Sequence, residues 1–104
     1  MKEKDESVSH LLDHLSLEKR SWETVDNWHG DLCAVGVQRK GNPRRLVYIS
    51  TFDLPPGWYF CECEVATGSG PTEFSVTRTE ERIDLEALER VLEMHLDRPF
   101  HVSE

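Results

Sequence analysis

The stretch that decides the fold opens with Arg45-Leu46-Val47-Tyr48-Ile49-Ser50-Thr51-Phe52 and runs on to Glu80. Its first eight residues are rich in β-branched and aromatic side chains, which favour a pleated strand. Asp53-Leu54-Pro55-Pro56-Gly57 then interrupts the pattern. Glycine directly after proline suits a type II turn, because glycine readily adopts the positive φ that this turn needs. We therefore expect consecutive antiparallel strands between residues 46 and 80.

The segment from Trp58 to Ala66 predicts a strand with two different faces. Side chains alternate between the faces of a strand. One face would carry apolar side chains, those of Tyr59, Cys61, Cys63 and Val65. The other face would be aromatic where the strand starts and acidic where it ends, with Trp58, Phe60, Glu62 and Glu64.

Two more strands are expected beside these. Residues 72–79 predict the last strand, with Phe74 and Val76 on one face. Residues 32–38 predict the first, and the turn-forming segment 39–43 joins it to the central stretch as a hairpin. The connections are too short for a crossover helix, so neighbouring strands must pair antiparallel.

Helical patterns lie at both ends of the chain. Residues 5–20 predict an amphipathic helix, with Asp5 placed to cap it and an apolar stripe of Val8, Leu11, Leu12 and Leu15. A second helix begins near Asp84, another good N-cap residue, and Pro99 limits its end. Its apolar stripe consists of Leu85, Leu88, Val91, Leu92 and Leu96.

Residues 21–30 fit two patterns. Trp22, Val25 and Trp28 could share a helical face, whereas Trp22, Thr24, Asp26 and Trp28 could share a strand face. We favour a short turn followed by irregular chain.

These elements predict an α+β fold: a four-stranded antiparallel β-meander with an N-terminal and a C-terminal helix packed on the sheet. Residues 1–104 are expected to form a single domain, with residues 1–6 frayed. The C-terminal helix should cover the face that carries Cys61, Cys63, Val65, Phe74 and Val76.

The charge of the chain restricts its partners. Its 20 acidic and 12 basic side chains leave a formal net charge of −8. Such a surface repels nucleic acid and anionic membranes and favours a basic partner. The chain has no apolar run of the roughly 20 residues that a membrane span needs, and its amino terminus lacks the apolar region of a secretory signal. Three cysteines, an odd number, indicate reduced thiols and a cytoplasmic location.

The cysteines and histidines offer several weak patterns. Cys33, Cys61 and Cys63 with His29 or His95 could hold zinc, but mid-strand cysteines are more typical of a core. His95 falls within the apolar stripe of the second helix, so it could face Cys61 or Cys63 and activate a thiol. A buried structural role is the simpler interpretation, and we expect no cofactor and no metal.

Two exposed clusters also have simple interpretations. His10 and His14 lie four residues apart on the polar side of the first helix, without a third ligand. Arg39, Lys40, Arg44 and Arg45 would be solvated charges at a hairpin tip, although they could touch an acidic partner.

The aromatic residues carry the functional hypothesis. Exposed aromatic surface bordered by charge marks interfaces. We predict a binding surface formed by Tyr48, Trp58, Phe60, Glu62 and Glu64, which Phe52 could extend. If this surface is exposed, it is the expected interface. We favour the other possibility, in which the N-terminal segment covers it through Trp22 and Trp28.

Small size, acidity, surplus aromatic residues and missing catalytic motifs predict a cytoplasmic protein-binding module. It would act stoichiometrically on a partner protein, as an adaptor, an inhibitor or an immunity-type protein does. One alternative is a small ligand-binding or thiol-dependent enzyme domain that uses Cys61, Cys63 and His95. The other is a homodimeric structural domain, formed by self-association. We favour a protein that is not an enzyme.

Overall fold

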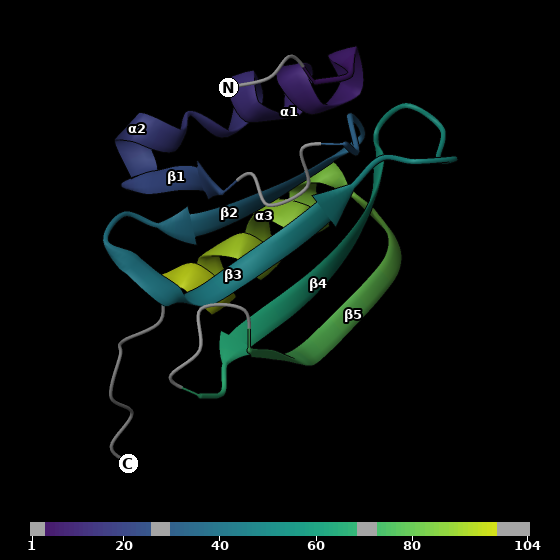
Figure 1. The fold of residues 1–104 in the computed structure, drawn as a ribbon. Coiled ribbons are helices and arrows are strands. Elements are labelled where there is room, and N and C mark those ends of the chain that lie inside the picture. The colour runs from purple at the N-terminus through teal and green to yellow at the C-terminus, as the bar shows by residue number, and fades with distance from the viewer. Residues whose placement is uncertain (1–3, 26–29, 69–72, 98–104) are drawn as a thin grey trace.

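The sheet contains five strands, each antiparallel to its neighbours and arranged in chain order (Figure 1). The computed structural model describes residues 4–25, 30–68 and 73–97. In chain order the elements are α1 (Glu6–Leu15), α2 (Leu17–Arg20), β1 (Trp22–Val25), β2 (Ala34–Arg39), β3 (Asn42–Ser50), β4 (Trp58–Ala66), β5 (Phe74–Asp84) and α3 (Leu85–Leu96). The predicted α+β class and antiparallel meander are confirmed.

Two glycines make the tight turns that the sequence predicted. Gly41 has a φ of 76° in the hairpin between β2 and β3, and Gly57 has a φ of 89° just before β4. The backbone amide of Trp58 donates to the carbonyl of Pro55 over 3.2 Å, so Gly57 is the third residue of a hydrogen-bonded turn. The Pro-Gly pair therefore places the start of β4 beside the end of β3.

Both long helices pack on the same face of the sheet. Asp5 caps α1 by accepting from the amide of Ser7, and Asp84 caps α3 by accepting from the amide of Ala87. The buried side chains beneath the helices come from alternate strand positions: Val35, Val37, Val47, Ile49, Tyr59, Cys61 and Cys63. The helices contribute Val8, Leu11, Leu15, Leu88, Val91, Leu92 and Leu96. In Figure 1, α3 lies behind the sheet, and α1 lies along the edge of the sheet that β1 forms.

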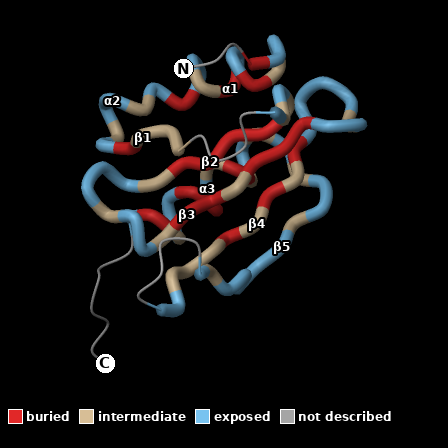
Figure 2. The backbone as a smooth tube through the Cα atoms, viewed as in Figure 1, coloured by how far each residue is buried: buried red, intermediate tan, exposed pale blue. Residues whose placement is uncertain are grey.

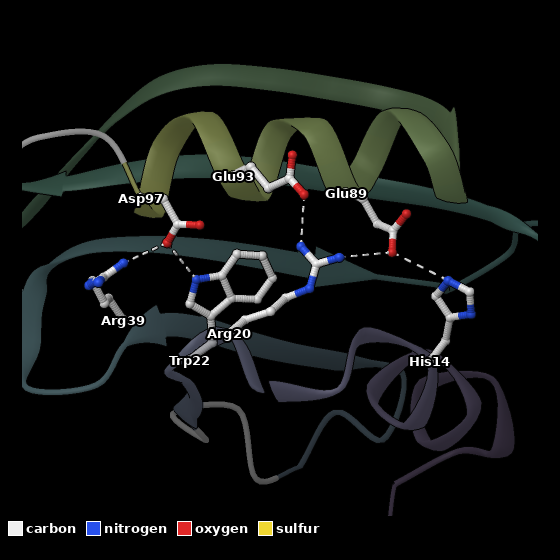
Figure 3. Close-up of polar contacts among 7 residues, drawn as sticks. All are labelled: His14, Arg20, Trp22, Arg39, Glu89, Glu93 and Asp97. Atoms are coloured by element: carbon white, nitrogen blue, oxygen red, sulfur yellow. Dashed lines mark hydrogen bonds and ion pairs between the residues drawn. The ribbon is translucent and has the colours of Figure 1, made fainter. Parts of the chain in front are cut away.

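The expectation of four strands is wrong, because residues 22–25 form a fifth. β1 pairs antiparallel with β2, and Trp22 stands opposite Arg39. Trp22 is 1% exposed, and its indole Nε1 donates to Asp97 at the end of α3 (Figure 3). The sequence of a four-residue strand has little intrinsic preference for β structure. Burial of the Trp22 indole stabilises β1 instead.

The first helix is also shorter than expected. α1 ends at Leu15, and Ser16 adopts a left-handed conformation with a φ of 53°. The helix predicted over residues 5–20 is therefore two helices with a change of direction. Lys4 is buried, and its Nζ donates to the carbonyl of Asp31 over 3.0 Å, so Lys4 already packs against the rest of the fold.

Two β-bulges change the face that β5 presents. The register with β4 shifts between Tyr59 and Cys61 and again between Cys63 and Glu64. After the second shift, Val76 stands opposite Glu64 and Phe74 opposite Ala66, on the face away from the helices. The prediction that α3 covers Phe74 and Val76 is wrong, because a bulge inserts one residue and inverts the alternation. Val76 is 49% exposed.

None of the helices among the described residues is both long enough and apolar enough to span a membrane.

Candidate functional site

The sheet face opposite α1 and α3, called here the open face, carries the five predicted binding residues. Tyr48 stands opposite Glu62, and Ser50 stands opposite Phe60, across the β3–β4 pairing. Trp58 and Glu64 lie at even positions of the same strand β4 and therefore point to the same side. We call the set Tyr48, Trp58, Phe60, Glu62 and Glu64 the aromatic–acidic patch.

Accessibility divides the open face into two halves. On the β2–β3 side, Ala34 is fully buried and Leu46 is 3% exposed. On the β4–β5 side, Trp58 is 37% exposed, Phe60 and both glutamates are half-buried, and most of β5 is exposed. Figure 2 shows the same contrast between β2 and β5. The accessible surface of the open face therefore lies over β4 and β5.

Two ring contacts hold the aromatic end of the patch. The rings of Tyr48 and Phe60 meet edge to face, with centroids 6.1 Å apart and an interplanar angle of 77°. The guanidinium of Arg82, from β5, lies 5.1 Å from the centroid of the Trp58 ring. Both arrangements are favourable for aromatic groups. Neighbouring side chains within the chain thus position the rings.

The acidic end of the patch is electrostatically unbalanced. Among the described residues, neither Glu62 nor Glu64 has a cation or a hydrogen-bond donor at its side chain. Partial burial, and secondarily the charge of Glu62, raises the pKa of Glu64. Burial also raises the pKa of Tyr48, and the carboxylates of Asp31, Glu62 and Glu64 add to that effect. Uncompensated negative charge therefore lies beside the aromatic rings.

Apolar surface continues beyond the start of β4. Phe52 is 71% exposed and Leu32 is 48% exposed. The β2–β3 pairing extends past the strands, since the amide of Thr51 donates to the carbonyl of Cys33 over 2.9 Å. Phe52 and Leu32 therefore lie at the same end of the sheet as Trp58. Phe52 was expected as an extension of the binding surface; Leu32 was not, although alternation over residues 32–38 places it on the side away from the core.

Trp22 does not cover the patch. Its side chain lies on the helix side of the sheet, beside α3 (Figure 3). The interpretation that Trp22 shields the aromatic surface is wrong, because β1 aims this residue at the core. Trp28, the other residue expected to cover the patch, lies outside the described residues.

The surroundings of Cys61 and Cys63 disfavour the hypothesis that His95 activates one of their thiols. Cys61 and Cys63 are 1% and 2% exposed. Burial raises the pKa of Cys61 to about 12 and also raises the pKa of Cys63. His95 Nε2 lies 3.0 Å from the carbonyl oxygen of Glu64, and a carbonyl only accepts, so this nitrogen carries a proton. Buried, protonated thiols are poor nucleophiles.

A groove of about 610 Å³ does lie beside α3, and its lining includes Cys63, Thr77, Arg78, Met94 and His95. The structure thus places Cys63 and His95 on one groove. Cys33, half-buried, is a free thiol like the other two cysteines. No group of three or more His, Cys, Asp or Glu side chains among the described residues could hold a metal ion. His29 lies outside those residues.

The other charged clusters make contacts within the chain. His10 lies 3.9 Å from Glu6, and His14 lies 3.3 Å from Glu89 on α3. In the basic cluster, Arg39 pairs with Asp97 over 2.7 Å (Figure 3).

Two more side chains of the basic cluster also contact other parts of the chain. Lys40 pairs with Glu18 over 3.1 Å, and Arg45 donates to the carbonyl of His95 over 3.4 Å. Three of the four basic side chains therefore hold the fold together as well as facing solvent.

Comparison with known proteins adds no assignment: neither a family model, nor a curated protein, nor a solved structure matches the chain.

Proposed function

We propose that this protein is a small protein-binding module that acts stoichiometrically on a partner protein, as an adaptor, an inhibitor or an immunity-type protein. Its contact surface is the aromatic–acidic patch on the open face. The observation that carries the proposal is the half-exposed row of Trp58, Phe60, Glu62 and Glu64 on a single strand face. Aromatic anchors beside charge are typical of protein interfaces.

The charge of the chain supports a basic partner rather than nucleic acid. A net charge of −8 would steer a positively charged protein toward the patch and oppose a phosphate backbone. The three free cysteines fit a reducing compartment, which is why we place the module in the cytoplasm.

The test is capture of partners from a lysate of the source organism on the immobilised wild-type protein and on Trp58→Ala. Met94→Ala is the matched control, because Met94 is an exposed apolar residue (62%) on α3. We expect a protein that the wild type and Met94→Ala retain and that Trp58→Ala loses. Light scattering on the purified pair should then give a one-to-one complex. Equal capture by all three proteins, or no capture, would contradict the proposal.

Self-association is the alternative occupant of the same surface. A second copy seated on the patch would make the solution mass of the wild type rise with concentration, whereas Trp58→Ala would stay at the monomer mass. That outcome would replace a partner protein by a homodimer and would reject the stoichiometric-binder proposal.

The groove beside α3 supports a second candidate, binding of a small ligand near Cys63 and His95. Its volume of about 610 Å³ is within the range of small-molecule sites. A His95→Ala variant should then lose the thermal stabilisation that a bound ligand confers, whereas Trp58→Ala should keep it.

A further inference from the structure

The two carboxylates of the patch are spaced for a single cationic group. Glu62 and Glu64 are two residues apart on the same face of β4, which places their Cα atoms about 7 Å apart. Both side chains are half-buried. A cation that bridges them would relieve the repulsion between them, and among the described residues none does so.

The surroundings of these carboxylates favour a flat cation. Tyr48 stands opposite Glu62, and its ring meets Phe60 edge to face, so an aromatic surface borders the acidic pair. The same surface already carries one guanidinium, since Arg82 lies over the ring of Trp58. On β5, the neighbours of the acidic pair are the uncharged Thr79 and Val76, opposite Glu62 and Glu64 respectively. They neither supply a competing cation nor repel an incoming one.

We propose that the partner contributes an arginine, whose guanidinium binds between the carboxylates of Glu62 and Glu64 while its flanking apolar residues lie against Trp58 and Phe60. This inference rests on the proposed function and names the chemistry of the partner. Arginine fits better than lysine for two reasons: its planar fork of donors can serve both carboxylates, and its weakly hydrated face stacks on aromatic rings.

The accessible half of the open face determines where the partner segment that carries this arginine can lie. Leu46 and Ala34 are buried, so the segment must run over β4 and β5 rather than over β2. Val76, 49% exposed, stands beside Glu64 on β5, and Phe52, 71% exposed, lies at the Trp58 end of the sheet, so both add exposed apolar surface near the patch. An arginine flanked by apolar residues is therefore the partner sequence that the surface favours.

The test uses three nine-residue peptides with blocked ends and the same apolar flanking residues. They differ at the central position, which is arginine, lysine or the neutral arginine analogue citrulline. Binding is followed by amide chemical shifts in a titration of the full chain at low salt. We expect shifts centred on β4, binding by the lysine peptide that is weaker by about threefold or more, and no measurable binding by the citrulline peptide.

Matched variants separate a specific site from general attraction to an acidic chain. Glu62→Gln/Glu64→Gln should weaken binding of the arginine peptide by about tenfold or more. Asp13→Asn/Glu86→Gln removes the same two charges from exposed positions on α1 and α3 and should bind as the wild type does. Equal binding of arginine and citrulline peptides, or equal losses in the two double variants, would overturn the inference.

The proposed function can survive that failure. If Trp58→Ala loses the captured partner but Glu62→Gln/Glu64→Gln retains it, the patch binds a protein and the arginine assignment is wrong. If both variants retain the partner, the function and the inference fail together.

Discussion

The indole Nε1 of Trp22 donates to Oδ1 of Asp97 over 2.9 Å, and this contact joins β1 to the C-terminal end of α3 (Figure 3). Arg39 from β2 donates to the same oxygen over 2.7 Å. The guanidinium of Arg20 lies 4.9 Å from the centroid of the Trp22 ring and pairs with Glu93. Residues distant in the sequence thus hold the edge strand β1, its neighbour β2 and the short helix α2 against α3.

Trp22→Phe is expected to lower the free energy of unfolding by about 2 kcal/mol, because it removes a partly buried hydrogen bond from a buried indole to a charged acceptor. Asp97→Ala should cost a similar amount, since it leaves the Trp22 indole without this acceptor. The double variant should lose about 1 kcal/mol less than the sum of the two. Urea unfolding of the four proteins measures this coupling.

Trp58→Phe is the control for that cycle, because Trp58 lies on the open face and is far more exposed than Trp22. It should change the free energy of unfolding by about 0.5 kcal/mol or less. Additive losses from Trp22→Phe and Asp97→Ala would show that the contact does not stabilise the fold.

The thiols of Cys61 and Cys63 are expected to resist alkylation in the folded protein. With a pKa of about 12, roughly one Cys61 in 10,000 is a thiolate at pH 8, and burial further limits access. Half-buried Cys33 should react first, and all three should react quickly in urea. Mass spectrometry of labelled peptides follows each site. Rapid native labelling of Cys63 would instead favour the thiol-dependent alternative.

Glu64→Gln is expected to be more stable than the wild type near neutral pH and not at pH 3.5. Burial raises the pKa of Glu64 above its ordinary value of 4.5, so the folded chain holds this proton more tightly than the unfolded chain. The wild type therefore loses stability as the pH rises through 4.5 and the folded-state pKa. Water screens this half-buried group, so the difference should be about 0.5 kcal/mol or less.

Urea unfolding of the wild type and Glu64→Gln between pH 3.5 and 7 tests the sign. Glu86→Gln, at an exposed position on α3, provides the control. A Glu64→Gln variant whose advantage shrinks with rising pH would mean that the folded state stabilises the charged carboxylate.

Gly57→Ala is expected to destabilise the fold by about 1 kcal/mol or more, because alanine disfavours the positive φ of 89° at this turn. An added Cβ would meet no atom within 4 Å at Gly57, so the cost is conformational rather than steric. Gly30 also has open space but lacks a positive φ, and Gly30→Ala should be nearly neutral. Thermal unfolding compares them, and equal melting temperatures would refute this account.

Local chemistry in the sequence determined much of the fold. The Pro-Gly pair before Trp58 predicted its turn, and Asp5 and Asp84 predicted the starts of two helices. Each of these signals depends on a few adjacent residues. Strict alternation along β4 also predicted that Trp58, Phe60, Glu62 and Glu64 share a face, and that Tyr48 could join them. Whether this face binds a partner stays a prediction.

Tertiary structure alone decided the features that depend on distant residues. β1 forms because Trp22 is buried beside Asp97, a relation that no local pattern over residues 22–25 contains. The bulges in β5 depend on its pairing with β4, and they moved Val76 from the expected core to the open face. Short strands and shifts of register are determined by the neighbouring strand and not by local periodicity, so sequence alone could not place them.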